Sequence, residues 1–327
     1  MMVKLNAIHY PFVEDINIPK EYSLDILKNN ELYLEKEKEF LKKYSFSHLK
    51  TFSFTKDGFL ALLLELKDQG NIAISLGETN ALVEAGKMYE TLGFKICWID
   101  LQKEGQINFE TIQKLDLEFL FVSSYIMDTF VQTNLEKVKQ VTNAQIISNA
   151  TIESNSFSDA IYFDPYKLTG FNTSGVFLSH GLLQKQSMAF IDTVSVYHLF
   201  NALEKQKNVS TPKNKFKIIL EELFGDDLYF FVDSDTTFDY TLHFALKHLK
   251  ARELIRTLAL DEILITNGEG CSLGLSQPSK IVQAMGYEED ISRNGISLSF
   301  FQELSDENIE KTCKIIHKRY KQIRILS

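Results

Sequence analysis

Cysteine is scarce in this sequence, which contains only Cys97, Cys271 and Cys313 among its 327 residues. The three are odd in number and far apart along the chain, so neither a disulfide framework nor a C-x-x-C metal site is predicted. No two of the seven histidines pair at the spacing of metal ligands. These absences favour a protein of the reducing cytoplasm and predict no metal site.

An excess of positive charge and long apolar segments are also missing. The formal net charge is −9, whereas binding to nucleic acid needs clustered Lys and Arg, so no nucleic-acid partner is predicted. No stretch approaches the roughly 18 apolar residues that cross a membrane, and the N-terminus lacks an apolar core of signal-peptide length. We therefore expect a soluble, cytoplasmic protein without a membrane partner.

Apolar residues make up 44% of the chain, enough to fill the core of one large domain with a smaller one. Up to about residue 150, short apolar runs of strand type alternate with segments of helical periodicity. The expected strands are 51–54, 72–75, 95–100, 118–124 and 144–148. This alternation predicts an α/β fold with a mainly parallel central sheet and helices on both faces.

The pattern changes in the second half of the chain. Two further strands, 159–163 and 175–179, are joined too closely for a helical crossover, so they are either antiparallel neighbours or linked by a loop over the end of the sheet. Later elements indicate a smaller α+β domain, with 205–215 as an exposed link. The expected domains are 20–200 for the large one, and 1–19 with 201–327 for the small one.

The segment ILITNGEGCSLGLSQPSKIVQAMG, residues 263–286, runs from a strand through three glycines and Cys271 into a helix. Such a glycine-rich turn could bind a nucleotide phosphate at the helix start. However, Pro278 and Ser279 mark the helix start well after the last glycine, and only one strand follows. The nucleotide interpretation is therefore rejected, and the loop is better explained as a segment that positions Cys271.

The same segment resembles the active-site loop of cysteine desulfurases, the NifS-like members of the class V aminotransferase family of fold-type I pyridoxal phosphate (PLP) enzymes. The matching motifs are NGEGC at 267–271, SQPS at 276–279 and QAMG at 283–286. Upstream, 163–179 is similar to the segment around the family's cofactor lysine, and 74–112 to the segment with its cofactor-stacking histidine. The resemblance implies a PLP-dependent transferase-like fold, PLP as cofactor, and a homodimer.

The resemblance places Lys167 at the Schiff-base position and makes Cys271 the residue that accepts sulfur as a persulfide. A lysine amine that attacks an aldehyde needs its pKa lowered by a desolvated site. A thiolate on a glycine-containing loop can attack the sulfur of a bound cysteine and carry it to an acceptor protein. Cys97 and Cys313 are interpreted as core packing.

The resemblance also implies roles for other residues around the cofactor. These are Thr55 at the phosphate, Thr79 over the ring, Asn149 at the ring nitrogen, and Asp164 and Tyr166 beside Lys167. Several depart from the family pattern. An aspartate becomes Asn149, which makes the ring a poorer electron sink; the stacking histidine becomes Thr79, which has no ring.

Two further departures concern charge. A serine of the family becomes Asp164, whose carboxylate would repel a nearby phosphate, and the arginine that binds the substrate carboxylate falls at Ser297. We therefore expect a cysteine desulfurase of weak or altered activity, acting on cysteine or a related amino acid. The alternatives are a non-catalytic scaffold in sulfur or iron–sulfur assembly, and a class V aminotransferase on another amino acid in which Cys271 is incidental.

Overall fold

A seven-stranded sheet forms the centre of the chain. The computed structural model describes residues 2–11, 31–183, 191–206, 209, 212–268 and 277–326, so Cys271 lies outside the described residues. In spatial order the strands are β2 (His48–Ser53), β8 (Ser174–Ser179), β7 (Ala160–Phe163), β6 (Gln145–Asn149), β5 (Phe119–Phe121), β3 (Ile72–Ser75) and β4 (Cys97–Ile99). Each contains residues of one of the seven segments predicted to be strands.

The sheet is mainly parallel, as predicted. Strands β7, β6, β5, β3 and β4 pair with their neighbours in parallel. Strand β8 is antiparallel to β7, which decides between the two connections left open for these strands. Strand β2 is antiparallel to β8 in turn, so its carboxyl end lies at the same edge as that of β7.

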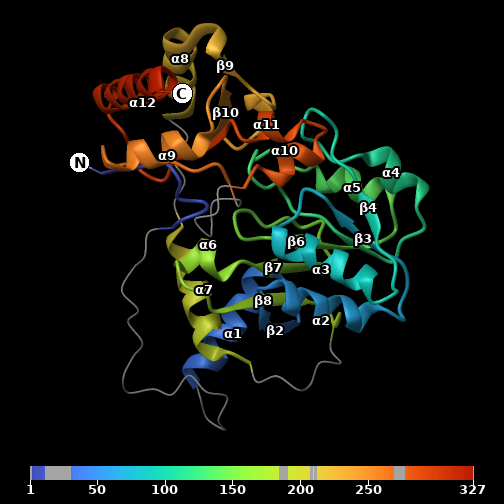
Figure 1. Ribbon diagram of the computed structural model, residues 1–327. Coiled ribbons are helices and arrows are strands. Elements are labelled where there is room, and N and C mark those ends of the chain that lie inside the picture. The colour runs from blue at the N-terminus through green and yellow to red at the C-terminus, as the bar shows by residue number, and fades with distance from the viewer. Residues whose placement is uncertain are drawn as a thin grey trace.

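Helices cover both faces of this sheet (Figure 1). They are α1 (Glu31–Tyr44), α2 (Lys56–Leu66), α3 (Asn80–Thr91), α4 (Phe109–Lys114), α5 (Leu135–Val141), α6 (Pro165–Thr169) and α7 (Thr193–Lys205). Alternate strand residues serve opposite faces: Ile74 packs with α2 and α3, whereas Ala73 packs with α4 and α5. Strands buried on both faces need apolar residues throughout, which explains their unbroken apolar runs.

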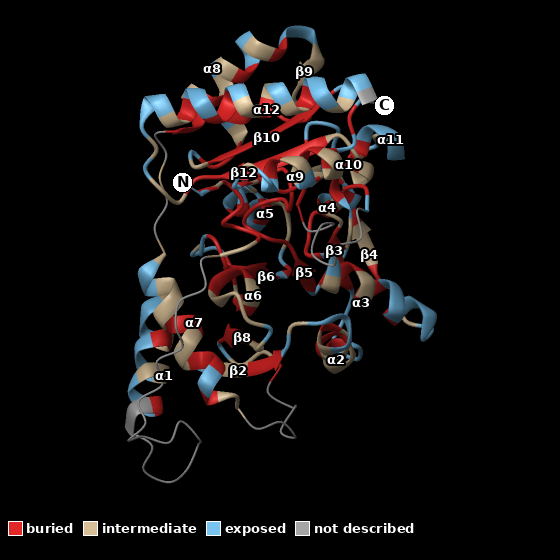
Figure 2. Ribbon diagram, turned by 60° about the vertical axis from the view of Figure 1, so that its left-hand side comes forward, coloured by how far each residue is buried: buried red, intermediate tan, exposed pale blue. Residues whose placement is uncertain are grey.

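A second, antiparallel sheet lies in the C-terminal part, with order β12 (Gly295–Ser299), β10 (Thr241–Leu246) and β9 (Leu228–Tyr229). Around it lie α8 (Pro212–Phe224), α9 (Ala251–Ala259) and α12 (Asp306–Leu326), which Figure 2 shows grouped together at one end of the molecule. The remaining elements are α10 (Lys280–Ala284), α11 (Glu289–Ser292), η1 (Gly225–Asp227) and η2 (Ser234–Thr236). The strand β1 (Val3–Lys4) joins this part by pairing with β11 (Ile263–Leu264).

One expectation about the chain between the two sheets is wrong for the residues from 212 onward. Residues 205–215 were expected to form an exposed link, but α8 already begins at Pro212 and Lys213 is buried. The Lys213 Nζ donates to the carbonyl oxygens of Ser234 (2.7 Å) and Phe238 (2.9 Å), which satisfies the ammonium group away from water. The domain boundaries themselves stay a prediction.

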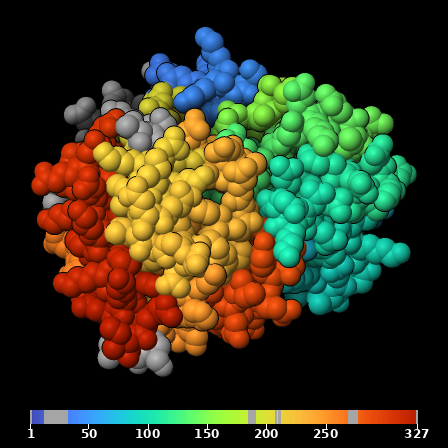
Figure 3. All heavy atoms as spheres, turned by 90° about the horizontal axis from the view of Figure 1, so that it is seen from above, coloured from blue at the N-terminus to red at the C-terminus, as the bar shows by residue number. Residues whose placement is uncertain are grey.

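The two parts share one apolar cluster. Ile8, Val131, Val232 and Met285 belong to it, and they come from both sides of the proposed boundary. Seen from above, the yellow to red C-terminal part is packed directly against the cyan and green part (Figure 3). Among the described helices, none combines the length and apolar character needed to span a membrane.

Candidate active site

Most of the predicted site residues lie at one edge of the large sheet, where the parallel strands end. Thr79 follows β3, Asn149 ends β6, Asp164 and Lys167 follow β7, and Thr55 follows β2. Three residues that the sequence analysis did not name lie at the same edge: Glu78 after β3, and Met127 and Asp128 after β5. In open α/β sheets, ligands bind at the carboxyl ends of the strands. The fold therefore brings residues far apart in sequence to the edge where a ligand is expected.

Lys167 lies on the short helix α6, with 7% of its surface exposed. Pro165 occupies the first turn, and the Asp164 Oδ1 caps the helix by accepting from the backbone N–H groups of Tyr166 (2.9 Å) and Lys167 (3.2 Å). The Lys167 Nζ lies 3.4 Å from the Met127 Sδ and 3.9 Å from the Asp164 Oδ2. The amine is thus buried beside one carboxylate and one thioether.

The Asp164 carboxylate caps the start of helix α6, a role that the sequence did not reveal. It was expected to face a cofactor phosphate; in the structure one of its oxygens caps α6 and the other lies near the Lys167 ammonium. Tyr166 on the same helix is half-buried, and its ring packs edge-on against Tyr10 with centroids 6.4 Å apart. Both cofactor contacts stay predictions.

Asn149 is fully buried at the end of β6. Its Oδ1 accepts from the backbone N–H (3.0 Å) and the hydroxyl of Thr151. The Thr151 Oγ1 in turn accepts from the Asp164 backbone N–H at 2.7 Å. The Asn149 Nδ2 has no hydrogen-bond partner among the described residues. A chain of hydrogen bonds therefore connects Asn149 to the start of the helix that bears Lys167.

A buried carboxylate, Glu78, was missed by the sequence analysis. Its Oε2 accepts from the hydroxyls of Ser123 (2.8 Å) and Tyr162 (2.7 Å) and from the Thr79 backbone N–H (3.2 Å). Tyr162 is the register partner of Asn149, so this cluster adjoins the Asn149 network. A charged residue three positions after the buried strand 72–75, at the end where ligands bind, was the signal that could have found it.

Thr55 and Thr79 each occupy the N-cap of a helix at this edge. Thr55 is exposed at the start of α2, and its Oγ1 accepts from the Gly58 backbone N–H at 3.3 Å. Thr79 is buried at the start of α3. A Cβ on Gly58 would lie 1.8 Å from the Ser53 carbonyl oxygen, so only glycine fits this approach of α2 to β2.

Asp128 connects the two ends of the cysteine loop to the lysine site. The Ser279 Oγ donates to its Oδ2 at 2.8 Å, after the segment 269–276. Before that segment, Gly268 is packed so closely that an added Cβ would lie 2.0 Å from the Asp128 Oδ1. The preceding residue, Met127, contacts the Lys167 Nζ. Cys271 itself falls in 269–276, outside the described residues.

Ser297, at the position of the family's arginine, has neutral surroundings. It is buried on β12, where its Oγ donates to the Asp128 carbonyl oxygen (2.8 Å) and lies 3.1 Å from the His243 Nδ1. Burial lowers the pKa of His243 to about 3, so this imidazole is neutral and does not replace the arginine. Arg293 is paired with Glu289 on α11.

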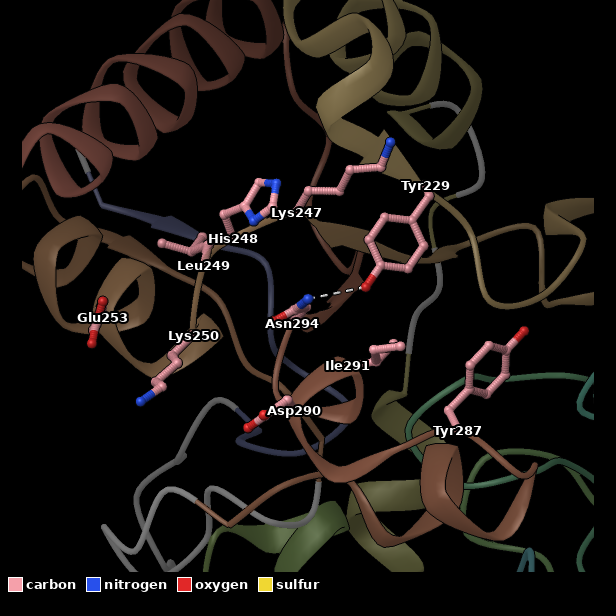
Figure 4. Close-up of a pocket in the computed structure, with 10 residues that line it drawn as sticks. All are labelled: Tyr229, Lys247, His248, Leu249, Lys250, Glu253, Tyr287, Asp290, Ile291 and Asn294. Atoms are coloured by element: carbon pink, nitrogen blue, oxygen red, sulfur yellow. Dashed lines mark hydrogen bonds between the residues drawn. The ribbon is translucent and has the colours of Figure 1, made fainter. Parts of the chain in front are cut away.

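A pocket of about 770 Å³ opens elsewhere, between β9, the β10–α9 connection and α11 (Figure 4). Tyr229 and Tyr287 line it, and the Tyr229 hydroxyl is 3.1 Å from the Asn294 side-chain amide. None of the predicted site residues lines this pocket. Within the described ranges, no group of His, Cys, Asp and Glu side chains is arranged to hold a metal ion.

The chain is similar in sequence to a cysteine desulfurase IscS of Buchnera aphidicola subsp. Schizaphis graminum, with 22% identity over 80% of this chain and 72% of the relative. No family model matches. Among solved structures, a NifS-like protein is similar with a TM-score of 0.78 and 14% identity, over 98% of this chain and all of the other. SspA, solved in complex with cysteine, has a TM-score of 0.70 and 14% identity, over 92% and 99% of the two chains.

These likenesses establish the fold. The chain has the NifS-like fold of class V aminotransferases, with a mainly parallel sheet and the carboxyl ends of its strands around Lys167. Its sequence likeness to a cysteine desulfurase supports a desulfurase-like function at a coarse level.

Proposed function

We propose that this protein is a PLP-dependent cysteine desulfurase in which Lys167 holds the cofactor and Cys271 receives the sulfur. The observation that carries the proposal is the position of Asp128: it contacts Gly268 and Ser279 on either side of the cysteine segment, and its neighbour Met127 contacts the Lys167 amine. Both ends of the segment that carries Cys271 therefore lie at the residue next to Met127, which supports assigning Lys167 and Cys271 to one site.

Chain length limits how far the thiol can be from this site. Cys271 follows Gly268 by three residues, and three residues span at most about 10 Å. A thiolate within that reach attacks the sulfur of a bound cysteine while the carbon–sulfur bond breaks. The sulfur leaves as the outer atom of a persulfide on Cys271, and the remainder of the substrate becomes alanine once its carbon has taken up a proton.

The residues at the strand ends fit a pyridoxal phosphate. Lys167 supplies a buried amine for attachment, the orphaned Asn149 Nδ2 calls for a ligand atom, and the α2 N-terminus at Thr55 suits the phosphate. When bound, the cofactor withdraws electrons from the substrate's α-carbon. Thr79, Tyr166 and Asp164 would surround it, and the Lys167 amine, once released, would move the proton.

A second candidate function rests on the neutral environment of Ser297. Neither it nor His243 carries a positive charge to pair with a substrate carboxylate. This favours weak activity, or a scaffold of the same fold that binds partners in sulfur or iron–sulfur assembly. An aminotransferase on another amino acid would need the lysine but not Cys271. We infer a sulfur-acceptor protein as partner, a homodimer as assembly and the cytoplasm as location.

Visible absorbance of the full chain incubated with PLP separates these functions. We expect a band of lysine-bound cofactor that is lost in Lys167→Ala; its absence in the unaltered protein would leave the scaffold. Given the band, sulfide release from cysteine should disappear in Cys271→Ser and persist in the matched control Cys97→Ser. Sulfide release that survives Cys271→Ser, or a band with amino transfer alone, would contradict the desulfurase.

A further inference from the structure

We infer that Asn149 is built to donate a hydrogen bond from Nδ2 to a ring nitrogen that carries no proton, so that the cofactor is held as a neutral pyridine. The inference rests on the proposed function, because it assumes that PLP binds at Lys167. It concerns the electronic state of the ring, which sets the kind of chemistry that the site supports.

The orientation of the Asn149 amide is dictated by its neighbours. A backbone N–H can only donate, so the atom that faces the Thr151 N–H at 3.0 Å must be the amide oxygen. The Thr151 hydroxyl accepts from the Asp164 N–H at 2.7 Å and donates its own hydrogen to the same amide oxygen. Exchanging the amide oxygen and nitrogen would place the NH2 group against the Thr151 backbone N–H, a donor against a donor.

The amide nitrogen is therefore left as a donor, and it is buried without a partner among the described residues. A buried donor without an acceptor is costly, so the loaded site is expected to supply an acceptor. A neutral ring nitrogen has a lone pair and can accept. A protonated ring nitrogen is itself a donor, and it would face the amide hydrogens with like polarity.

The burial of Asn149 strengthens this selection. Water does not compete for the amide of a residue with 0% of its surface exposed. The amide is also uncharged, so unlike a carboxylate it does not stabilise a positively charged ring. The neutral ring withdraws fewer electrons from a substrate carbon than the protonated one. The site should thus favour steps that depend less on carbanion stabilisation, and desulfuration should be slow.

Nitrogen NMR of the full chain loaded with ring-labelled [15N]PLP tests the protonation state directly. We expect a shift typical of neutral pyridine without coupling to a bonded hydrogen. In Asn149→Asp, the carboxylate can still accept from Thr151, and its second oxygen favours a protonated ring, so the resonance should move upfield and acquire N–H coupling. A protonated ring in the unaltered protein would overturn the inference while leaving the proposed function intact.

A second measurement tests the inference even if the aspartate variant fails to fold. The N-methylated analogue of PLP has no lone pair on the ring nitrogen, so the unaltered protein should bind it about tenfold or more weakly than PLP. Asn149→Ala should lose this discrimination. Equal affinity for both compounds in the unaltered protein would contradict the hydrogen bond. Failure of PLP to attach at Lys167 would instead refute the proposed function and the inference together.

Discussion

At the scale of single residues, His243 combines full burial with a hydrogen bond to the Ser297 hydroxyl. Burial lowers its pKa to about 3, whereas an unfolded histidine titrates near 6.5. Between these values the unfolded chain binds one proton more than the folded chain. The contribution of His243 to stability is therefore complete above about pH 6.5 and is lost as the pH falls toward 3.

This linkage predicts that the free energy of unfolding depends more steeply on pH in the unaltered protein than in His243→Phe. The difference should approach about 1.4 kcal/mol per pH unit below pH 6, measured as the free energy of unfolding in urea at a series of pH values. His248→Asn is the matched control, because His248 is exposed and asparagine tolerates its positive φ of 57°. Parallel curves for the phenylalanine variant and the unaltered protein would rule out a neutral, buried His243.

Lys213 supports a second prediction at this scale. Burial lowers the pKa of its ammonium group, which nevertheless donates to carbonyl oxygens around η2. Lys213→Met removes these buried hydrogen bonds, although Thr237 and Thr241 still donate to the same carbonyls, and should lower the free energy of unfolding by about 2 kcal/mol. Lys217→Met, which removes one half-buried bond to the Ser234 hydroxyl, should cost less than about 1 kcal/mol. Denaturant titration of both variants measures the contrast, and equal losses would contradict it.

At the scale of elements, helix α6 depends on its cap. The Asp164 Oδ1 accepts from two backbone N–H groups at the helix start, and an asparagine oxygen can accept the same two bonds. Asp164→Ala should therefore lower stability by about 1 kcal/mol, whereas Asp164→Asn should change it by less than half of that. Thermal unfolding followed by circular dichroism compares them. If the asparagine variant lost as much, the charge beside Lys167 rather than the cap would be the main contribution.

Elements were predictable where the physical pattern was strong. The mainly apolar segments 72–75 and 159–163 predicted central strands, because a strand covered on both faces is apolar along most of its length. Helix α7 (Thr193–Lys205) was missed; the first turn of its buried face carries Thr193 and Ser195, which weakens the apolar periodicity there. The start of α8 was mistaken for a link because Lys213 is charged, and its carbonyl acceptors lie more than 20 positions later in the sequence.

At the scale of the whole molecule, the site depends on contacts that no local pattern contains. Asp128 meets Ser279 across 151 positions and Ser297 across 169. The family resemblance brought attention to Lys167 and Asn149 but not to Asp128, Thr151 or Glu78. Local periodicity cannot reveal such pairings, because they arise only when the two sheets pack together.

The shared apolar cluster predicts that both parts of the chain unfold in one step. Trp98 is the only tryptophan and lies on β4 of the large sheet, so its fluorescence reports on that sheet, whereas far-UV circular dichroism reports on the entire chain. The two signals should change at the same denaturant concentration. Domains joined only by a small polar interface would instead give separate transitions.

Met285→Ala makes the test sharper. Met285 belongs to the C-terminal part but is buried in the cluster that also contains Val131 of the large-sheet part. Removing its side chain should lower the free energy of unfolding by about 3 kcal/mol. If the parts unfold together, the Trp98 midpoint moves down with the circular dichroism midpoint, although the substitution lies outside the large sheet. A fluorescence midpoint that stays in place while the other falls would show that the two parts unfold independently.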